Sequence, residues 1–412
     1  MARNRTTLMA GVAVAATLAM SPGETRAAEP IKLGVLEDQS GDFALATIGK
    51  VHGIQIATDE INAAGGIAGR KLELVIYDTQ SDNTRYQEFM RRVLQRDKAD
   101  VVFAGFSSAS REAYRPIADQ LNGFVFYNNQ YEGGVCDAHM MVTGAVPEQQ
   151  FSTLVPWMME RFGKRVYTIA ADYNFGQISA EWVRNIVKEN GGTMAGEEFI
   201  PLGVSQFSST IQNIQKAKPD ILITLLVGTA QSSYYEQAAA ANLHVPMGSS
   251  VNVGQAYEHK RFKPPSLANM YVTTNWIEEV DDQKSKDFVT KWHAKYPNEP
   301  YINQEAENSY LAVYLYKSMV ERAGGSTKRD DLRKEVAKGD VCVDAPEGKV
   351  CLDPKSQHMS HTIYLAKVGD DHSISFPKTW SEIKPYWLGA AGCDLTKKNP
   401  NAQYTPSSPP PK

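Results

Sequence analysis

Short apolar runs of strand length alternate with helix-length segments along most of this 412-residue chain. Two of the first runs are residues 31–36 and 72–77. The alternation pauses at 143–147 and resumes with an expected helix over 148–161 and a strand over 165–170. Strands that alternate with helices are typical of parallel sheets covered by helices. Because the pattern occurs twice, we predict an α/β protein with two doubly wound parallel-sheet lobes.

The segment 57–82 shows how a strand follows a helix in this pattern. Gly65 and Gly66 suit the turn between the helix and the strand, because glycine adopts positive φ without a steric penalty. The strand 72–77 comes next and is followed by Asp78. In open parallel sheets the ligand-binding loops lie at the carboxyl ends of the strands. Polar residues that follow strands are therefore the first candidates for a binding site.

Residues 1–28 have the features of a cleaved Sec signal peptide. Arg3 and Arg5 precede an apolar stretch of thirteen residues, and small residues lead to a cleavage site after Ala27 or Ala28. An anchor helix is the alternative, but the apolar stretch is short and a Pro-Gly break follows it. No cysteine occurs at the cleavage site, which argues against a lipoprotein. We therefore predict export to the periplasm.

The four cysteines favour disulfides, since their count is even and the predicted compartment is oxidising. Cys342 and Cys351 flank a segment that looks like a hairpin, so we expect them to pair. Cys136 and Cys393 are then the remaining pair, although four cysteines allow three connectivities. Two His-containing segments near these cysteines lack partners at metal-ligand spacing, so we expect no metal site.

Composition and motifs argue against an enzyme and against nucleic-acid binding. The formal net charge of -4 indicates no basic surface for nucleic acid. The sequence contains no P-loop, nucleophile elbow, zinc-protease or dinucleotide-binding motif. The serines of 107–108 follow a strand, but no histidine occurs in another loop of the predicted cleft, so a nucleophile has no base. We predict a protein that is not an enzyme and has no cofactor.

The loops that follow strands are rich in hydroxyls, amides and aromatic rings. Such side chains exchange hydrogen bonds with a small polar solute while the rings exclude water. Core packing is the alternative role of each ring, but their recurrence after strands in both halves favours a cleft. The predicted ligand-binding residues are Ser107, Ser108, Tyr127, Asn129, Tyr131, Glu132, Asp172, Tyr173, Phe175, Gly228, Thr229, Asn252 and Trp276.

Several of these segments resemble one family of solute-binding proteins. The family includes the Leu/Ile/Val-binding proteins, the amide-binding regulators and the urea-binding proteins of transporters. The segments that resemble its urea- and amide-binding branch are 127–133, 143–150, 172–175, 196–203 and 226–229. The resemblance extends from about Ile31 to Leu395. It implies the type I periplasmic binding protein architecture, with ligand held between two lobes.

The resemblance also implies lobe boundaries and ligand contacts. Lobe 1 is expected to contain 29–146 and 276–358, and lobe 2 to contain 147–275 and 359–398. The tail 399–412 is rich in Pro, Ser and Asn, and we expect it to be disordered. Three crossovers are expected near 143–147, 275–277 and 356–361. The positions that correspond to ligand contacts in the branch are Ser108, Tyr127, Asn129 and Phe175; Asn129 stands where threonine or valine is common.

The ligand class is predicted from charge. Amino-acid-binding members of the family offer an acidic residue of the second lobe to the ligand's ammonium group. Here the loop Val227–Gln231 is neutral, and an uncompensated ammonium is costly to bury. Asp172 or Glu132 would have to supply the charge instead. The neutral loop favours urea or a short-chain amide.

The resemblance implies the partners as well. We expect a small-molecule ligand and an ABC permease in the inner membrane. A branched-chain amino acid or an aromatic acid is the alternative ligand, and a ligand-sensing module is the alternative role. A hydrolase is a third alternative, which release of ammonia from amides would reveal.

Overall fold

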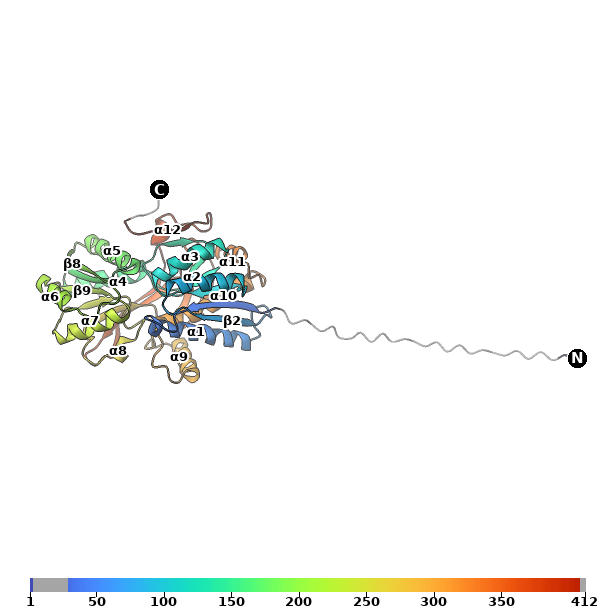
Figure 1. Cartoon of the computed structure of the whole chain (residues 1–412), viewed down its shortest axis with the longest axis horizontal. Helices are drawn as coiled ribbons and strands as arrows, with labels where there is room; N and C mark the ends of the chain where they lie inside the picture. Colours follow the sequence, from blue (N-terminus) through green and yellow to red (C-terminus); the bar gives the residue numbers. More distant parts are fainter. Residues whose placement is uncertain (3–28, 408–412) are drawn as a thin grey trace.

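The computed structural model describes residues 1–2 and 29–407. Two lobes lie side by side, and each is built on its own β-sheet (Figure 1). The predicted α/β fold class is confirmed. The predicted signal peptide and its cleavage site lie outside the described residues, apart from Met1 and Ala2. In the described part of the chain, no helix combines the length and apolar character that crossing a bilayer requires.

The sheet of lobe 1 has five parallel strands in the order β2-β1-β3-β4-β6. Their bounds are β1 (Ile31–Glu37), β2 (Leu72–Asp78), β3 (Val101–Ala104), β4 (Val125–Tyr127) and β6 (Met140–Val142). Between them run α1 (Ala44–Ala63), α2 (Asn83–Gln95) and α3 (Ser108–Gln120). These strands are almost continuously apolar because helices cover both faces of a parallel sheet.

Three later helices also belong to lobe 1: α9 (Gln283–Lys295), α10 (Gln304–Arg322) and α11 (Arg329–Val336). Helix α10 packs closely along α1. The contact requires glycine at position 53, because a Cβ atom there would lie 2.3 Å from the carbonyl oxygen of Ala306. A hairpin of β12 (Cys342–Ala345) and β13 (Gly348–Cys351) follows α11. Cys342 and Cys351 form a disulfide in this hairpin, as predicted.

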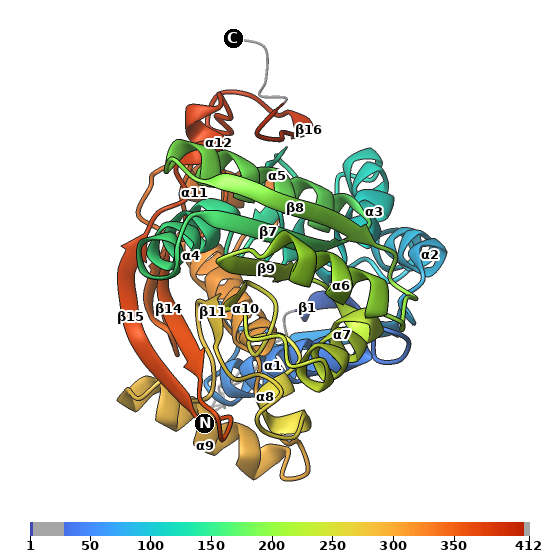
Figure 2. The same cartoon turned by 90° about the vertical axis from the view of Figure 1, so that its left-hand side faces the viewer.

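The sheet of lobe 2 has seven strands in the order β15-β14-β11-β10-β9-β7-β8 (Figure 2). The parallel strands are β7 (Arg165–Ala171), β8 (Thr193–Ile200), β9 (Ile221–Leu225), β10 (Met247–Ser249) and β11 (Met270–Thr274). Two antiparallel strands, β14 (His361–Val368) and β15 (Ile374–Ile383), extend one edge. The helices of this lobe are α4 (Pro147–Phe162), α5 (Asn174–Glu189), α6 (Ser208–Ala217), α7 (Gly228–Ala240) and α8 (Glu258–Arg261).

The chain passes between the two sheets after β6, after β11 and before β14. The three passages meet in a buried polar cluster. Thr143 of the first donates a hydrogen bond to the carbonyl oxygen of Asn308, 3.2 Å away. Asn275 of the second donates to Asn308 Oδ1 at 3.0 Å and to Glu347 Oε1 at 3.2 Å. The lobe boundaries expected from the sequence stay a prediction, but these passages lie where crossovers were expected.

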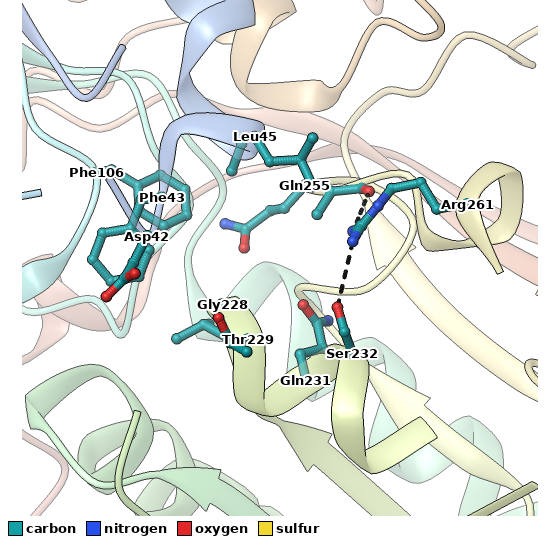
Figure 3. A pocket seen from close by; sticks show the side chains of 13 residues that line it. Asp42, Phe43, Leu45, Phe106, Gly228, Thr229, Gln231, Ser232, Gln255 and Arg261 are labelled. Atoms are coloured by element: carbon teal, nitrogen blue, oxygen red, sulfur yellow. Dashed lines mark hydrogen bonds between the residues drawn. The ribbon is translucent and has the colours of Figure 1, made fainter. Parts of the chain in front are cut away.

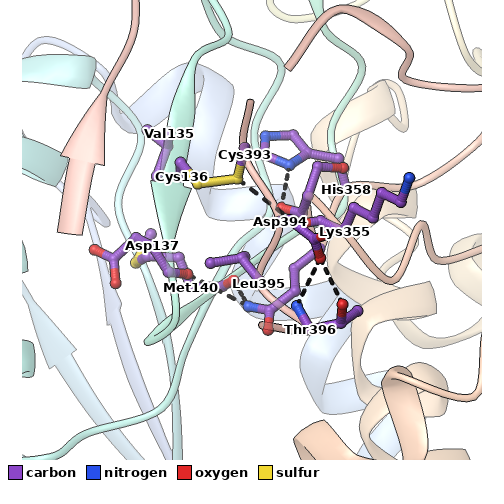
Figure 4. Close-up of a disulfide and its surroundings, with 12 residues drawn as sticks. Val135, Cys136, Asp137, Met140, Lys355, His358, Cys393, Asp394, Leu395 and Thr396 are labelled. Atoms are coloured by element: carbon purple, nitrogen blue, oxygen red, sulfur yellow. Dashed lines mark hydrogen bonds between the residues drawn. A yellow bond between two sulfur atoms is a disulfide. The ribbon is translucent and has the colours of Figure 1, made fainter. Parts of the chain in front are cut away.

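The C-terminal part of the chain returns from lobe 2 to lobe 1. Helix α12 (Trp387–Ala390) follows β15, and Cys393 then forms a disulfide with Cys136 of β5 (Val135–Asp137) (Figure 4). Strand β16 (Asn401–Gln403) pairs antiparallel with β5. The Cys136–Cys393 pairing is confirmed. The prediction of a disordered tail is wrong for residues 401–403, because backbone pairing with β5 orders a segment of low apolar content.

Candidate functional site

Two cavities adjoin each other between the lobes, at the carboxyl ends of the parallel strands. The inner cavity has a volume of about 10 Å³, roughly the space of one water molecule. The outer cavity has a volume of about 290 Å³. Phe106, Val227 and Gln255 line both, so the two cavities are parts of one interlobe site. The residues of the inner cavity are Phe106, Ser108, Asn129, Gln130, Tyr173, Phe175, Val227 and Gln255.

The start of α3 places a serine at the inner cavity. Ser107 is the N-cap of this helix, and its Oγ accepts a hydrogen bond from the backbone N–H of Ser110 at 3.0 Å. The cap fixes the first turn, in which Ser108 lines the inner cavity. Two adjacent serines therefore have different roles: one ends the loop, and the next faces the cavity.

Two polar side chains of the inner cavity, Asn129 and Ser108, have their donors engaged elsewhere. Asn129 Nδ2 donates to the carbonyl oxygens of Phe106 at 3.0 Å and Gln130 at 2.8 Å. Because carbonyl oxygens only accept, the atom that contacts them must be the amide nitrogen, which fixes the orientation of the Asn129 side chain. Its Oδ1 is then buried without a partner among the described residues. Ser108 Oγ donates to a carboxylate oxygen of Glu132. A hydroxyl has one donor, so Ser108 presents only lone pairs to a ligand.

Gln255 of the loop after β10 adds a third acceptor. One N–H of its Nε2 donates to Glu305 Oε1 at 3.1 Å, which leaves its side-chain oxygen and its second N–H available. Burial is the main cause that raises the pKa of Glu305, to about 7, against the opposing charge of Lys50. The inner cavity thus offers three acceptors and contains no charged side chain among its lining residues.

An ion pair lies behind Ser108. Arg111 Nη2 donates to Glu132 Oε1 at 2.7 Å, and both side chains are fully buried. The guanidinium lies 5.1 Å from the ring centre of Tyr127 and 4.7 Å from that of Tyr131. Burial lowers the pKa of Arg111, but the charge of Glu132 and of further neighbours raises it by more, so the arginine stays charged.

The outer cavity opens between α1 of lobe 1 and α7 of lobe 2 (Figure 3). Phe43 and Phe106 form an aromatic wall, with ring centres 5.1 Å apart. Gly228 starts α7 with a φ of +63°, a conformation that favours glycine, and its nearest neighbour across the cleft is Phe43. Asp42 and Arg261 are the charged residues of the lining. Arg261 is exposed, and its Nη2 lies 3.5 Å from Ser232 Oγ.

Six of the thirteen predicted ligand-binding residues line these cavities. Ser108, Asn129, Tyr173 and Phe175 line the inner one, and Gly228 and Thr229 line the outer one. The structure therefore brings together loops of both lobes that are up to 121 residues apart in sequence (229 − 108). Their role in ligand binding stays a prediction.

The other seven predicted residues are absent from both linings. Ser107 is a helix cap. Tyr127 donates to the Phe106 carbonyl at 2.6 Å, and Tyr131 contacts His358 Nε2 at 2.5 Å. Glu132 is paired with Arg111. The remaining three are Asp172, which is exposed and accepts from Gln177 at 2.9 Å; Asn252, which is fully buried beside β10; and Trp276, which donates to Ser285 Oγ at 2.9 Å in the core.

Sequence reasoning missed several lining residues. Phe43, Phe106 and Gln130 lie in post-strand loops that were recognised, so their position was the available clue. Gln255 follows β10, a strand of three residues that was not recognised. The loop after that strand had already supplied one candidate, Asn252, but nothing in the sequence separated it from Gln255.

Comparison with known proteins identifies the family. A family described as periplasmic binding protein matches residues 30–373. The chain belongs to this family. The match makes it a substrate-binding protein rather than an enzyme. Among the described residues no group of three or more His, Cys, Asp or Glu side chains is arranged to hold a metal ion.

Individual relatives of this periplasmic binding protein are distant. Leu/Ile/Val-binding protein homolog 7 of Brucella abortus (strain 2308) is 25% identical over 232 residues, which cover 53% of this chain. The match spans 58% of the length of that relative. The common sequence is thus too limited to carry over a ligand.

Solved structures share the fold. A solute-binding protein of an ABC transporter from R. palustris, in complex with benzoate, superposes with a TM-score of 0.74 at 20% identity, covering 86% of this chain and 97% of that one. The branched-chain amino acid transporter substrate binding protein LivJ from Streptococcus pneumoniae, in complex with isoleucine, gives 0.73 at 19% identity, covering 86% and 100%. At this identity the likeness shows the fold alone.

Proposed function

We propose that this chain is the periplasmic solute-binding component of an ABC importer and that its ligand is a small neutral N–H donor, urea or a short-chain amide. Ligand binds between the lobes, and the closed form docks on a permease of the inner membrane. Family membership supports the binding role, and a Sec signal peptide at residues 1–28 would bring the chain to the periplasm. The hydrogen-bond polarity of the inner cavity is the observation that carries the choice of ligand.

The inner cavity is matched to a donor group, such as the NH₂ of a ligand that occupies the larger outer cavity and reaches inward. Asn129 Oδ1 is buried and unpartnered among the described residues, and such an atom costs about 1–3 kcal/mol unless a ligand or water donates to it. Ser108 also presents an acceptor, because its one donor bonds to Glu132, and the side-chain oxygen of Gln255 is a further acceptor. The NH₂ groups of urea and amides supply several donors without a net charge. Phe106, Tyr173 and Phe175 would enclose the ligand and exclude water.

A carboxylate or an ammonium group fits this cavity less well. A carboxylate only accepts, so against three acceptors it would gain no hydrogen bond from them. An ammonium group donates, but it needs a counter-charge when buried. Glu132 already pairs with Arg111 at 2.7 Å, and Asp172 is exposed and outside the lining. Neither acid is placed to neutralise an α-ammonium group.

Arg261 supports a second candidate, an amino acid or aromatic acid. Its guanidinium lines the outer cavity and forms no ion pair with a carboxylate among the described residues, so a ligand carboxylate there would gain a charged hydrogen bond. The structural neighbours that bind benzoate and isoleucine agree with this option. In this case the acid group would face the outer cavity and the apolar part the aromatic wall of Phe43 and Phe106.

A thermal-shift screen of the mature protein, followed by calorimetric titration, distinguishes the two candidates. The panel contains urea, acetamide, isobutyramide, isoleucine and 4-hydroxybenzoate. A ligand at one hundred times its Kd stabilises the fold by about 2.7 kcal/mol, which raises the Tm by a few degrees. Stabilisation by urea or an amide alone supports the proposal. Stabilisation by isoleucine or 4-hydroxybenzoate alone would establish the second candidate instead.

A genetic experiment tests the transport role. Deletion of the gene should abolish uptake of the identified solute by the host, and the intact gene should restore it. Unchanged uptake together with a lost transcriptional response to the solute would indicate a sensing module and contradict the importer role.

A further inference from the structure

The C-terminal segment 384–407 crosses the junction of the two lobes and is bound to both. On lobe 2, Trp387 of α12 packs against Trp182 of α5, with ring centres 5.0 Å apart. On lobe 1, the Cys136–Cys393 disulfide and the pairing of β16 with β5 hold the segment (Figure 4). Figure 1 shows α12 above the junction of the lobes. The segment lies beyond residues 30–373, the part of the chain that the family description matches.

Gln403 of this segment completes the ion pair behind the inner cavity. Its Nε2 donates to Glu132 Oε1 at 2.8 Å, and its Oε1 accepts from Arg111 Nη2 at 3.1 Å. A guanidinium only donates and a carboxylate only accepts, so the orientation of the amide is determined by its partners. One amide therefore bridges both charges of a fully buried pair.

The bridge affects Ser108 through Glu132. Arg111 and Gln403 both donate to Oε1 of Glu132, while Ser108 donates to the other carboxylate oxygen. The orientation of a buried carboxylate is fixed by all of its hydrogen-bond donors together, so loss of one donor lets the group rotate toward those that remain. If Glu132 turns, Ser108 loses its acceptor, and its O–H is free to point into the cavity. Ser108 would then present a donor to the ligand instead of an acceptor.

We propose that Gln403 is a positioning residue of the ligand site, and that the disulfide-bound C-terminal segment exists in part to place it. Through the Glu132–Arg111 pair, Gln403 keeps the Ser108 hydroxyl turned away from the cavity, and the cavity keeps its preference for ligands that donate. The inference rests on the proposed function, since the expected preference is for an amide over the matching carboxylate.

The chain offers a matched control on the same strand. Asn401 Oδ1 accepts from Arg115 Nη2 at 2.6 Å, and Arg115 in turn pairs with Asp137 at 2.9 Å. This ion pair resembles that of Glu132 and Arg111, but neither of its members bonds directly to a residue that lines either cavity. Gln403→Leu and Asn401→Leu thus each remove an amide contact to a buried arginine, but only the first removes a contact to the pair that bonds Ser108 directly; Asn401 is linked to that pair only through Arg115 and Glu112.

The test measures binding of acetamide and acetate to the wild type and both variants by calorimetry, with the Tm recorded without ligand. We expect Gln403→Leu to reduce the acetamide-to-acetate affinity ratio about tenfold, and Asn401→Leu to leave it within twofold, at comparable loss of Tm. The paired Cys136→Ser/Cys393→Ser variant should shift the ratio in the same direction as Gln403→Leu. An unchanged ratio in Gln403→Leu would overturn the inference.

The same variants keep this inference separate from the proposed function. The wild-type protein alone decides whether urea or amides bind. If it binds isoleucine or 4-hydroxybenzoate instead, the proposed function fails, and Gln403→Leu should still change affinity for that ligand at least fivefold while Asn401→Leu does not. Equal affinities of the two variants would then overturn the role of Gln403.

Discussion

His361 Nδ1 lies 2.9 Å from Glu347 Oε1, where the three passages between the lobes meet. Both side chains are fully buried. Burial raises the pKa of Glu347 well above 4.5, and burial together with the charge of Glu347 raises that of Glu307. Burial also lowers the pKa of His361 to about 3. Glu307, Glu347 and His361, where the three passages meet, therefore favour their neutral forms.

The Glu307→Gln variant should change how stability depends on pH. Because the pKa of Glu307 is raised in the folded state, folded protein holds a proton that unfolded protein releases above about pH 4.5, and stability falls as pH rises. Glutamine at this position does not titrate, so denaturation by guanidinium chloride between pH 5 and pH 8 should show a smaller decline in the free energy of unfolding. The lowered pKa of His361 has the opposite effect, because unfolded protein binds a proton there below about pH 6.5 and stability falls as the pH falls. The variant should keep this loss of stability at acidic pH. An unaltered decline above pH 5 would contradict the burial argument.

Asn129→Leu should weaken binding of the N–H donor ligand, because it removes the unpartnered acceptor of the inner cavity. Loss of one such hydrogen bond corresponds to about 1–3 kcal/mol, or roughly 5- to 150-fold in Kd. Asn62→Leu is the control, since Asn62 also bonds its amide to backbone, at 2.9 Å and 2.7 Å to Leu72, but lies outside both cavities. Titration calorimetry of both variants measures the effect. Equal Kd values for Asn129→Leu and Asn62→Leu would show that Asn129 does not contact the ligand.

Lys50→Met should destabilise lobe 1 strongly. Lys50 Nζ lies 2.8 Å from Glu37 Oε1, and both side chains have no exposed surface. Burial raises the pKa of Glu37 to about 8 despite the attraction of Lys50. Removing the lysine leaves a buried carboxyl without its partner, at a cost of about 1–3 kcal/mol while the group is protonated and more above pH 8, where it is charged. Chemical denaturation measures the loss of stability. Adding Glu37→Gln to the Lys50→Met variant should recover much of that loss. A double variant as unstable as Lys50→Met would show that the lysine stabilises lobe 1 by packing and not by its ion pair.

The two disulfides should contribute unequally to stability. Cys136 and Cys393 are separated by 257 residues and Cys342 and Cys351 by 9, so the first closes a far longer loop in the unfolded chain. Loop entropy gives about 5.5 kcal/mol for the first and about 2.5 kcal/mol for the second. Cysteine-to-serine pairs compared by denaturation should show this order, and the reverse order would point to effects in the folded state.

The fold was predictable because long apolar strands alternate with helices, as in 31–37 and 165–171. Strands such as β10 and β16 were not, since three residues carry no periodicity and their order comes from neighbouring backbone. The loops of the site were predictable from their place after strands. Which side chain faces the cavity was not: Ser107 and Ser108 are adjacent and alike, and capping geometry alone separates their roles. Glu132 looked free in sequence because Arg111 and Gln403 reach it only in the folded chain.

The disulfide between Cys136 and Cys393 closes a covalent ring that includes the three passages between the lobes and all of the lobe 2 sheet. A protease that cuts the backbone once within this ring cannot release either lobe. The nicked chain stays in one piece, with its two halves of the cleft still joined. On a gel, the nick would become visible only after reduction.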